Sequence, residues 1–133
     1  MPTVTSDQAW CVDVPHHPLG ARTARHRLVD VLRGRVHPER LADAVAVLAE
    51  LVGNAVRHAA PLPGNVVRVA WRLLDGGCVL IWVTDGGSTK SPAARAAEGD
   101  AVDGRGLTIV QALAARWGVE RDGRGQRVWA EIA

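Results

Sequence analysis

The stretch Glu50-Leu51-Val52-Gly53-Asn54-Ala55-Val56-Arg57-His58 decides the fold. It lies in the segment 38–60, which we predict to be one long helix because apolar residues recur in it at spacings of three and four. Glu50, Asn54 and His58 are each four residues apart and share a helix face other than the apolar one. Such a face is often only the solvated side of an amphipathic helix. However, Asn54 is of a type that prefers caps and turns, and a carboxylate one turn before a carboxamide suits a hard cation.

The composition is that of one globular domain. The chain has 133 residues, of which 47% are apolar and 23% charged, enough to form a substantial core. No apolar run approaches the roughly 18 residues of a membrane span, and residues 1–10 lack the pattern of a secretory signal. We therefore expect a cytoplasmic protein, with no membrane contact, that has a flexible tail over residues 1–8 and a single domain over residues 9–133.

Charge and cysteine usage exclude several other classes. The formal net charge is +2, and basic residues never form a run of five, so direct binding of nucleic acid is not indicated. Cys11 and Cys78 are far apart and are expected to be reduced and buried. The histidines do not have the spacing of a zinc site.

The hydrophobic pattern predicts helices and a sheet. A short strand over residues 9–14 precedes a helix that ends near Gly34, and the long helix follows. Residues 65–74 and 78–84 then read as a hairpin around Asp75-Gly76-Gly77. Because the second of these strands is almost wholly apolar, we expect it to be central in the sheet and buried on both faces.

The C-terminal part is predicted to add one helix and a second hairpin. The helix would open at Gly104 and run to Trp117, and the hairpin would join residues 118–121 to residues 126–132. The fold class is therefore α+β: a two-layer α/β sandwich whose mixed, mostly antiparallel sheet is covered on one face by helices.

Two glycine motifs accompany these elements. Asp85-Gly86-Gly87 follows the apolar strand at a point where the backbone must turn sharply or let a ligand approach closely, although a simple turn has the same pattern. After the irregular stretch 88–103, which is either a disordered loop or a lid, Gly104-Arg105-Gly106-Leu107 opens a helix. Glycines there leave N–H groups free for phosphate, although they can equally serve only to make the loop flexible.

The order of the three motifs points to a family. The sequence has no Walker-type phosphate loop, no dinucleotide fingerprint and no nucleophile elbow. It does have E-x-x-x-N on a helix, D-x-G after a strand and G-x-G-L opening a helix. This combination resembles the GHKL-type, or Bergerat, ATPase fold of gyrase, sensor histidine kinases and MutL. Within that group the chain is most similar to the small stand-alone anti-sigma-factor serine kinases of actinobacterial type, and Trp117-Gly118-Val119 adds to this likeness.

The resemblance implies a role for each matching position. Asp85 would accept a hydrogen bond from the adenine amino group, and Gly87 would let the base lie against the backbone. Asn54 would supply an oxygen to Mg²⁺, and Glu50 would be the general base for phosphoryl transfer from ATP. The remaining nucleotide-binding positions contact or flank the phosphates: Arg57, His58, Gly104, Arg105, Gly106 and Leu107.

Two positions depart from the family pattern. The first glycine motif often continues as D-x-G-x-G, but Thr89 occupies the fifth position here. Near the C-terminus many relatives carry G-x-G-T, whereas this chain has Gly123-Arg124-Gly125-Gln126. The carboxamide of Gln126 either substitutes for the missing hydroxyl or weakens nucleotide binding. Losing one buried hydrogen bond costs about 1 kcal/mol, which is about fivefold in affinity, so we expect weakened and not abolished binding.

Three functions follow as hypotheses. The first is an ATP-dependent protein serine/threonine kinase that sequesters a sigma factor and phosphorylates an antagonist (anti-anti-sigma) protein in partner switching, with homodimerisation implied by the resemblance. The second is a non-catalytic module, with or without nucleotide, that holds a regulatory partner. The third, an arginine-rich nucleic-acid binder, predicts steeply salt-dependent binding to random duplex.

Overall fold

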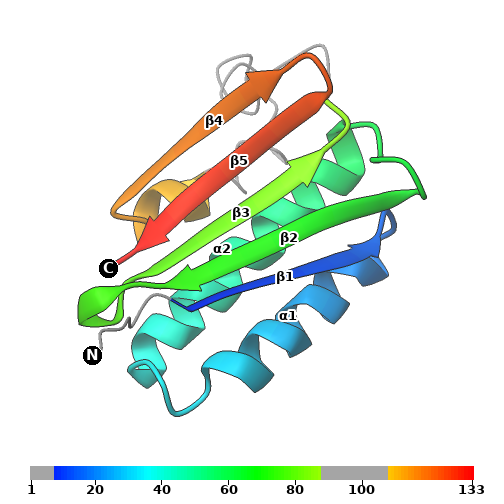
Figure 1. Cartoon of the computed structure of the whole chain (residues 1–133). Coiled ribbons are helices and arrows are strands. Elements are labelled where there is room, and N and C mark those ends of the chain that lie inside the picture. Colours follow the sequence, from blue (N-terminus) through cyan, green and yellow to red (C-terminus); the bar gives the residue numbers. More distant parts are fainter. Residues whose placement is uncertain (1–7, 88–107) are drawn as a thin grey trace.

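The chain folds into a five-stranded sheet with helices on one face (Figure 1). The computed structural model describes residues 8–87 and 108–133. The named elements, in chain order, are β1 (Gln8–Pro15), α1 (Leu19–Leu32), α2 (Pro38–His58), β2 (Val66–Leu73), the 3₁₀ turn η1 (Asp75–Gly77), β3 (Val79–Asp85), β4 (Arg116–Asp122) and β5 (Gly125–Ile132). Residues 108–113 are also helical. The predicted α+β two-layer architecture is confirmed.

The strand order is β1-β2-β3-β5-β4, and each described pairing is antiparallel. A mixed sheet was expected, but no parallel pairing occurs among these strands. The central place of β3 is confirmed, whereas its burial on both faces is wrong: Leu80, Trp82 and Thr84 alternate with buried residues and are only partly buried. The reason is that α1 and α2 both lie behind the sheet, and no described helix covers its front face (Figure 1).

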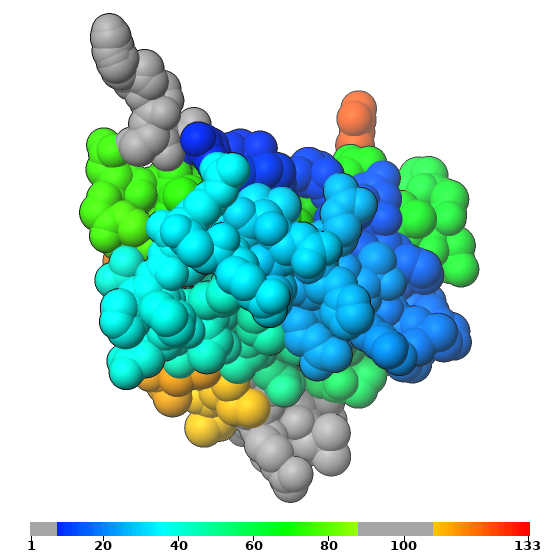
Figure 2. Space-filling model, turned by 90° about the horizontal axis from the view of Figure 1, so that it is seen from below, coloured from blue at the N-terminus to red at the C-terminus, as the bar shows by residue number. Residues whose placement is uncertain are grey.

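The long helix α2 forms the middle of the helical layer. Pro38 stands in its first turn, and the His37 ring accepts a hydrogen bond from the backbone N–H of Glu39 at 3.3 Å, which satisfies one of the free donors of the helix N-terminus. Its apolar face is buried against the sheet and α1, as the spacing predicted. Viewed from below, α1 and the start of α2 form one continuous surface layer (Figure 2).

The core fills the space between the helices and the inward-pointing side chains of the strands. On β3 these side chains are Val79, Ile81 and Val83, and each is at most 1% exposed. The same alternation places Asp85 in this layer, because it follows Val83 by two positions. On β5 it places Gln126 there, two positions before Val128. Two polar side chains thus lie in a layer that is otherwise apolar.

Three expectations about local structure need correction. The last helix ends at residue 113 in the described part of the chain, and Trp117 belongs to β4, because the strand pairing with β5 begins at Arg116. Cys11 is exposed, since its side chain lies on the uncovered face of β1, and Cys78 is only partly buried. The expected tail lies outside the described residues except for Gln8, where β1 begins.

Within residues 8–87 and 108–133, none of the helices combines the length and apolar character needed to cross a bilayer.

Candidate functional site

The C-terminus of α2 is tied to the end of β3 by two backbone hydrogen bonds. The N–H of Gly86 donates to the carbonyl of Ala60 at 2.7 Å, and the N–H of Ala60 donates to the carbonyl of Gly87 at 3.0 Å. Gly86 is also required sterically, because a Cβ there would collide with the carbonyl oxygen of Pro61. These contacts bring the E-x-x-x-N helix and the D-x-G motif to one end of the molecule.

Asp85 is the buried polar centre of this end. Its side chain is 1% exposed, and Oδ1 accepts a hydrogen bond from the backbone N–H of Gly87 at 2.7 Å. Gln126 lies directly opposite on β5, and its Nε2 donates to Asp85 Oδ2 at 3.4 Å, a long and therefore weak hydrogen bond. The other amide atom, Gln126 Oε1, is buried without a hydrogen-bond partner in the described part of the chain. Gln126 Oε1 can therefore accept a hydrogen bond beside Asp85.

Glycines border the Asp85–Gln126 pair and leave bare backbone beside it. Gly87 has φ +92°, a conformation that side chains disfavour, and its Cβ position lies 3.5 Å from the Cα of Gly125. A Cβ on Gly125 would in turn collide with the carbonyl oxygen of Asp85. A hollow of about 460 Å³ opens here, with Gly86, Gly87 and residues 121–126 around it. A flat ligand can approach the backbone closely at such a place.

Asn54 is the buried polar residue that α2 contributes to this end of the molecule. It is 6% exposed, and its Oδ1 has no hydrogen-bond partner among the residues that the structure describes. It precedes Ala60 by six residues, which corresponds to about 9 Å along a helix. Glu50, one turn earlier on the same face, is partly buried. A carboxylate and an unsatisfied amide oxygen therefore follow one another along α2.

Arg57 folds back along α2 over Gly53. Its Nη1 lies 2.9 Å from the place that a Cβ on Gly53 would occupy, so a larger residue at Gly53 would displace the end of the arginine side chain. The side chain is exposed, and its guanidinium lies one turn before its own Cα, near the level of Asn54. His58 is partly buried and, like Arg57, takes part in further interactions. This end of α2 thus combines a cation with an unpaired oxygen.

The sequence identified part of this arrangement. Most of the described candidates lie on the last two turns of α2 or at the adjoining ends of β3 and β5: Asn54, Arg57, His58, Asp85, Gly87 and Gln126. Glu50 lies one turn further back on α2. Gly104, Arg105, Gly106 and Leu107 lie outside the described residues. The sequence analysis gave no role to Gly53 or Gly125, and at Gly86 it predicted only a turn or a close ligand approach. The side chain and carbonyl groups that approach these three glycines could not be read from the sequence.

Comparison with known proteins supplies the family. Residues 14–132 match the family described as "Histidine kinase-like ATPase domain". The chain belongs to this family. The match covers the helices and sheet that build the site, and the suspected ATPase resemblance is therefore confirmed. No curated protein matches the sequence significantly.

Three solved structures share the fold. One contains the RsbU and RsbW domains of Rv1364c from Mycobacterium tuberculosis, with a TM-score of 0.71 and 22% identity over 94% of this chain and 32% of that one. Another is the SiaB-SiaC complex from Pseudomonas aeruginosa, with a TM-score of 0.67 and 18% identity over 92% of this chain and 88% of that one. The third is the histidine kinase domain of a blue-light activated histidine kinase from Erythrobacter litoralis, with a TM-score of 0.56 and 20% identity over 89% of this chain and 60% of that one. The chain thus spans about a third of the length of the first of these structures. At these identities the likeness establishes the fold that the chains share.

Proposed function

We propose that this member of the histidine kinase-like ATPase family binds ATP and transfers its γ-phosphoryl group to a serine or threonine of an antagonist protein in partner switching. The observation that carries the proposal is that two buried amide oxygens, Oε1 of Gln126 beside Asp85 and Oδ1 of Asn54 on α2, have no hydrogen-bond partner among the residues that the structure describes. Buried polar atoms are rarely left without partners, so a bound molecule that completes both groups is the economical explanation.

The Asp85–Gln126 pair suits the amino group of adenine. Asp85 offers carboxylate oxygens and Gln126 offers Oε1, so this part of the site presents acceptors. The exocyclic amino group of adenine carries two N–H donors, one for each residue. Guanine has a carbonyl oxygen at the same position of its ring, which would face acceptors without a proton between them. The pocket should therefore select ATP over GTP.

Asn54 suits the metal ion that accompanies the phosphates. A hard cation prefers oxygen ligands, and Oδ1 of Asn54, which has no partner within residues 8–87 and 108–133, can bind it without first losing a hydrogen bond there. When bound, Mg²⁺ would supply positive charge next to the phosphates. The exposed guanidinium of Arg57 would pair with phosphate oxygens at the same level of the helix. Gly104 and Gly106 would add backbone N–H groups, as the family resemblance implies.

Glu50 is the proposed general base. It lies one helical turn, about 5.4 Å, before Asn54, and so beside the expected metal position. Its carboxylate would take the proton of the attacking hydroxyl as the new oxygen–phosphorus bond forms and the bond to the β-phosphate oxygen breaks, which leaves ADP and a phosphorylated partner. Positioning and charge stabilisation would supply most of the rate acceleration.

The partner assignment rests on likeness alone. Two of the structures with the same fold contain an RsbW domain and a SiaB-SiaC complex, and these names support a regulatory protein as the partner. We infer a sigma factor, an anti-anti-sigma protein or both, in the cytoplasm, with a homodimer as the acting form.

A non-catalytic binding module is the second candidate. It is favoured by one observation: Gln126 already donates a hydrogen bond to Asp85. The carboxamide therefore takes up room and one acceptor position of Asp85 where adenine is proposed to bind. Such a protein would hold its regulatory partner without turnover.

Calorimetric titration of Mg²⁺-ATP and, separately, Mg²⁺-GTP into the full chain tests the proposal. Saturable binding of ATP with at least about tenfold weaker binding of GTP is expected, since the base contacts differ by at least one hydrogen bond to a carboxylate. No ATP binding at millimolar concentration would exclude the kinase and leave the binding module. If ATP binds, loss of phosphotransfer in Glu50→Gln with retained ATP affinity distinguishes a kinase from a nucleotide-dependent scaffold.

A further inference from the structure

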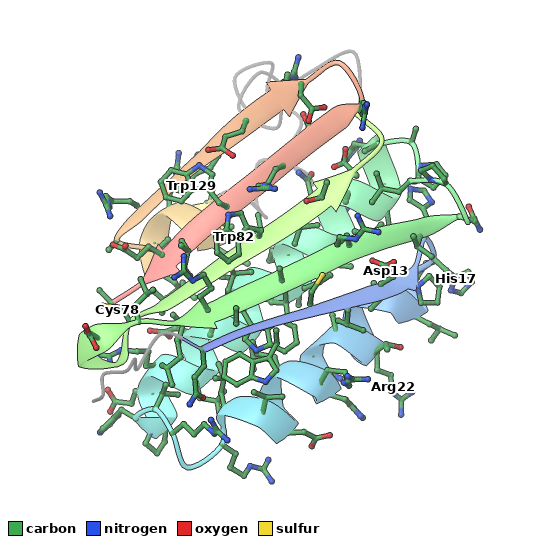
Figure 3. All side chains as sticks on the ribbon, viewed as in Figure 1. Asp13, His17, Arg22, Cys78, Trp82 and Trp129 are labelled. Atoms are coloured by element: carbon green, nitrogen blue, oxygen red, sulfur yellow. The ribbon has the colours of Figure 1, made fainter. Side chains whose placement is uncertain are left out.

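The face of the sheet that the described helices leave uncovered (Figure 1) carries an apolar row across all five strands. Strand register places the following residues side by side in this order: Cys11, Ala70, Trp82, Trp129 and Gly118. The two indole side chains stand next to each other at the middle of the face (Figure 3). Neither tryptophan is fully buried. Large aromatic side chains on an uncovered face are an unusual feature for a free surface.

Charged rows flank the apolar row on both sides. Towards the Asp85 end the register aligns Asp13, Arg68, Thr84, Arg127 and Glu120. Towards the other end it aligns Ala9, Arg72, Leu80, Glu131 and Arg116. An apolar centre with tryptophan, framed by polar residues and arginines, is the usual composition of a protein-binding surface.

Ion pairs hold several of these arginines in place. Arg68 Nε lies 2.9 Å from an oxygen of Asp13, and Arg116 Nη2 lies 2.9 Å from an oxygen of Glu131. The hydrogen bond that Arg68 donates to the Asp13 carboxylate, together with the negative charge of that carboxylate, raises the pKa of Arg68 above its ordinary value. Two of the N–H groups of Arg68 point to Asp13, and a guanidinium has further donors to offer a ligand.

A hollow lies beside Trp82, where the row has small side chains. Cys11 and Ala70 leave a volume of about 390 Å³ next to the indole ring. Arg68, Arg72 and Arg127 border it, and no carboxylate of the described chain does. At the other side of the tryptophan pair there is less room, because the ring of Trp129 lies over Gly118, with Nε1 only 2.9 Å from the place of a Cβ. The hollow therefore has an apolar floor and a positively charged border.

We propose that this face binds a partner protein through a segment that carries one bulky apolar side chain between two carboxylates. The apolar side chain enters the hollow over Ala70 beside Trp82, and the carboxylates pair with Arg68 and Arg72. None of these residues belongs to the nucleotide site, so the inference does not depend on ATP binding.

The spacing of the arginines defines the segment further. Arg68 and Arg72 stand on β2 at either side of Ala70, about 13 Å apart at a strand rise of about 3.3 Å per residue. Two acidic residues eight positions apart on a helix are about 12 Å apart, with the apolar residue midway between them on the same side. Two acidic residues four positions apart in an extended segment match equally well.

A second copy of the chain fits this face less well. A twofold axis along the strands through β3 would set Arg68 against Arg127 and Asp13 against Glu120. A twofold axis along the apolar row would set Arg68 against Arg72. The first arrangement also sets Arg72 against Glu131, and the second also sets Arg127 against Glu131 and Glu120 against Arg116. At Arg68, which borders the hollow, both arrangements nevertheless set arginine against arginine, which an acidic partner avoids.

Selection from a phage-displayed random peptide library with the full, nucleotide-free chain tests the proposal. Enriched peptides should carry a bulky apolar residue flanked by aspartate or glutamate. A synthetic peptide of the enriched sequence is then titrated into the wild type, Ala70→Met and Arg72→Glu, with Arg22→Glu on the exposed side of α1 as the matched charge-reversal control (Figure 3). Thermal melts confirm that each variant is folded.

We expect about tenfold or greater loss of affinity in Ala70→Met, which fills the hollow, and in Arg72→Glu, which reverses its charge. Arg22→Glu should change the affinity by less than about twofold, and added salt should weaken binding to the wild type. Three outcomes would overturn the proposal: no enrichment, enriched peptides without acidic residues, or equal affinity for wild type and Ala70→Met. A dimer in sedimentation equilibrium that Ala70→Met dissociates would also overturn it, in favour of a second copy.

Discussion

Asp85 and Gln126 face each other across β3 and β5, and the carboxamide of Gln126 donates to the carboxylate of Asp85 at 3.4 Å. Both side chains are buried in a layer that is otherwise apolar. The second oxygen of Asp85 is held by the backbone N–H of Gly87, so the carboxylate has a fixed orientation. This pair is the part of the site whose chemistry is most specific.

Asp85→Asn should weaken Mg²⁺-ATP binding by about tenfold to a hundredfold, because a hydrogen bond to a charged acceptor contributes about 1.5–3 kcal/mol. The replacement keeps an oxygen for the Gly87 N–H, so the fold should remain. Isothermal titration calorimetry measures the affinity, and Asp30→Asn on the exposed side of α1 is the matched control. Unchanged ATP affinity in folded Asp85→Asn would show that Asp85 does not bind the adenine ring.

Gln126→Met should reduce the ability of the protein to distinguish ATP from N6-methyl-ATP. In the wild type the methyl group removes one of the two amino N–H donors, and Gln126 Oε1 is the acceptor that we expect to lose its partner. Methionine has a similar shape but no amide oxygen. In Gln126→Met the second amino N–H of ATP therefore has no acceptor at this position, and methylating it loses no hydrogen bond. The four affinities form a double-mutant cycle with an expected coupling of about 1 kcal/mol.

A cycle without coupling would show that Gln126 does not contact the amino group. If ATP itself still binds to the wild type, that result leaves the nucleotide site in place. The affinity of Gln126→Met for ATP is therefore measured as well as its preference for ATP over N6-methyl-ATP.

Gly86→Ala should lower the free energy of unfolding by about 1–3 kcal/mol, because the added methyl group collides with the carbonyl oxygen of Pro61. The clash would also strain the hydrogen bonds that tie Gly86 and Gly87 to Ala60. Gly123→Ala is the matched control, since a Cβ at that position meets no atom within 4 Å. Urea denaturation followed by tryptophan fluorescence gives both values. Equal stability of the two variants would mean that the backbone at Gly86 moves without cost.

The sequence predicted the elements that have strong local patterns. The spacing in α2 and the turn residues of both hairpins were sufficient to place Asp85 at the end of a central strand and Gln126 at the start of the last one. The expected end of the last helix at Trp117 was wrong, because pairing with distant residues of β5 makes Trp117 part of a strand.

The expected burial of β3 on both faces, which would have covered Trp82, was also wrong for a related reason. An apolar run reports that side chains avoid water, but not which of its two faces the helices cover. The close approaches at Gly86 and Gly125 likewise depend on carbonyl groups from other segments, so the glycines could be read from the sequence but their neighbours could not.

Asn54→Ala should abolish the increase in ATP affinity that Mg²⁺ gives, without destabilising the fold. The Asn54 oxygen has no partner in the described chain, so its removal loses no hydrogen bond there, and alanine is the better helix former by about 0.5 kcal/mol. The contrast is Leu51→Ala, three residues earlier and 2% exposed, which should cost about 2–5 kcal/mol of unfolding free energy. ATP titrations with Mg²⁺ and with EDTA, together with urea denaturation, separate the two effects. A functional residue is kept at a cost to stability, so Asn54→Ala should be as stable as the wild type or more so. A variant that is clearly less stable, yet still responds to Mg²⁺, would show that Asn54 serves the fold and not the metal.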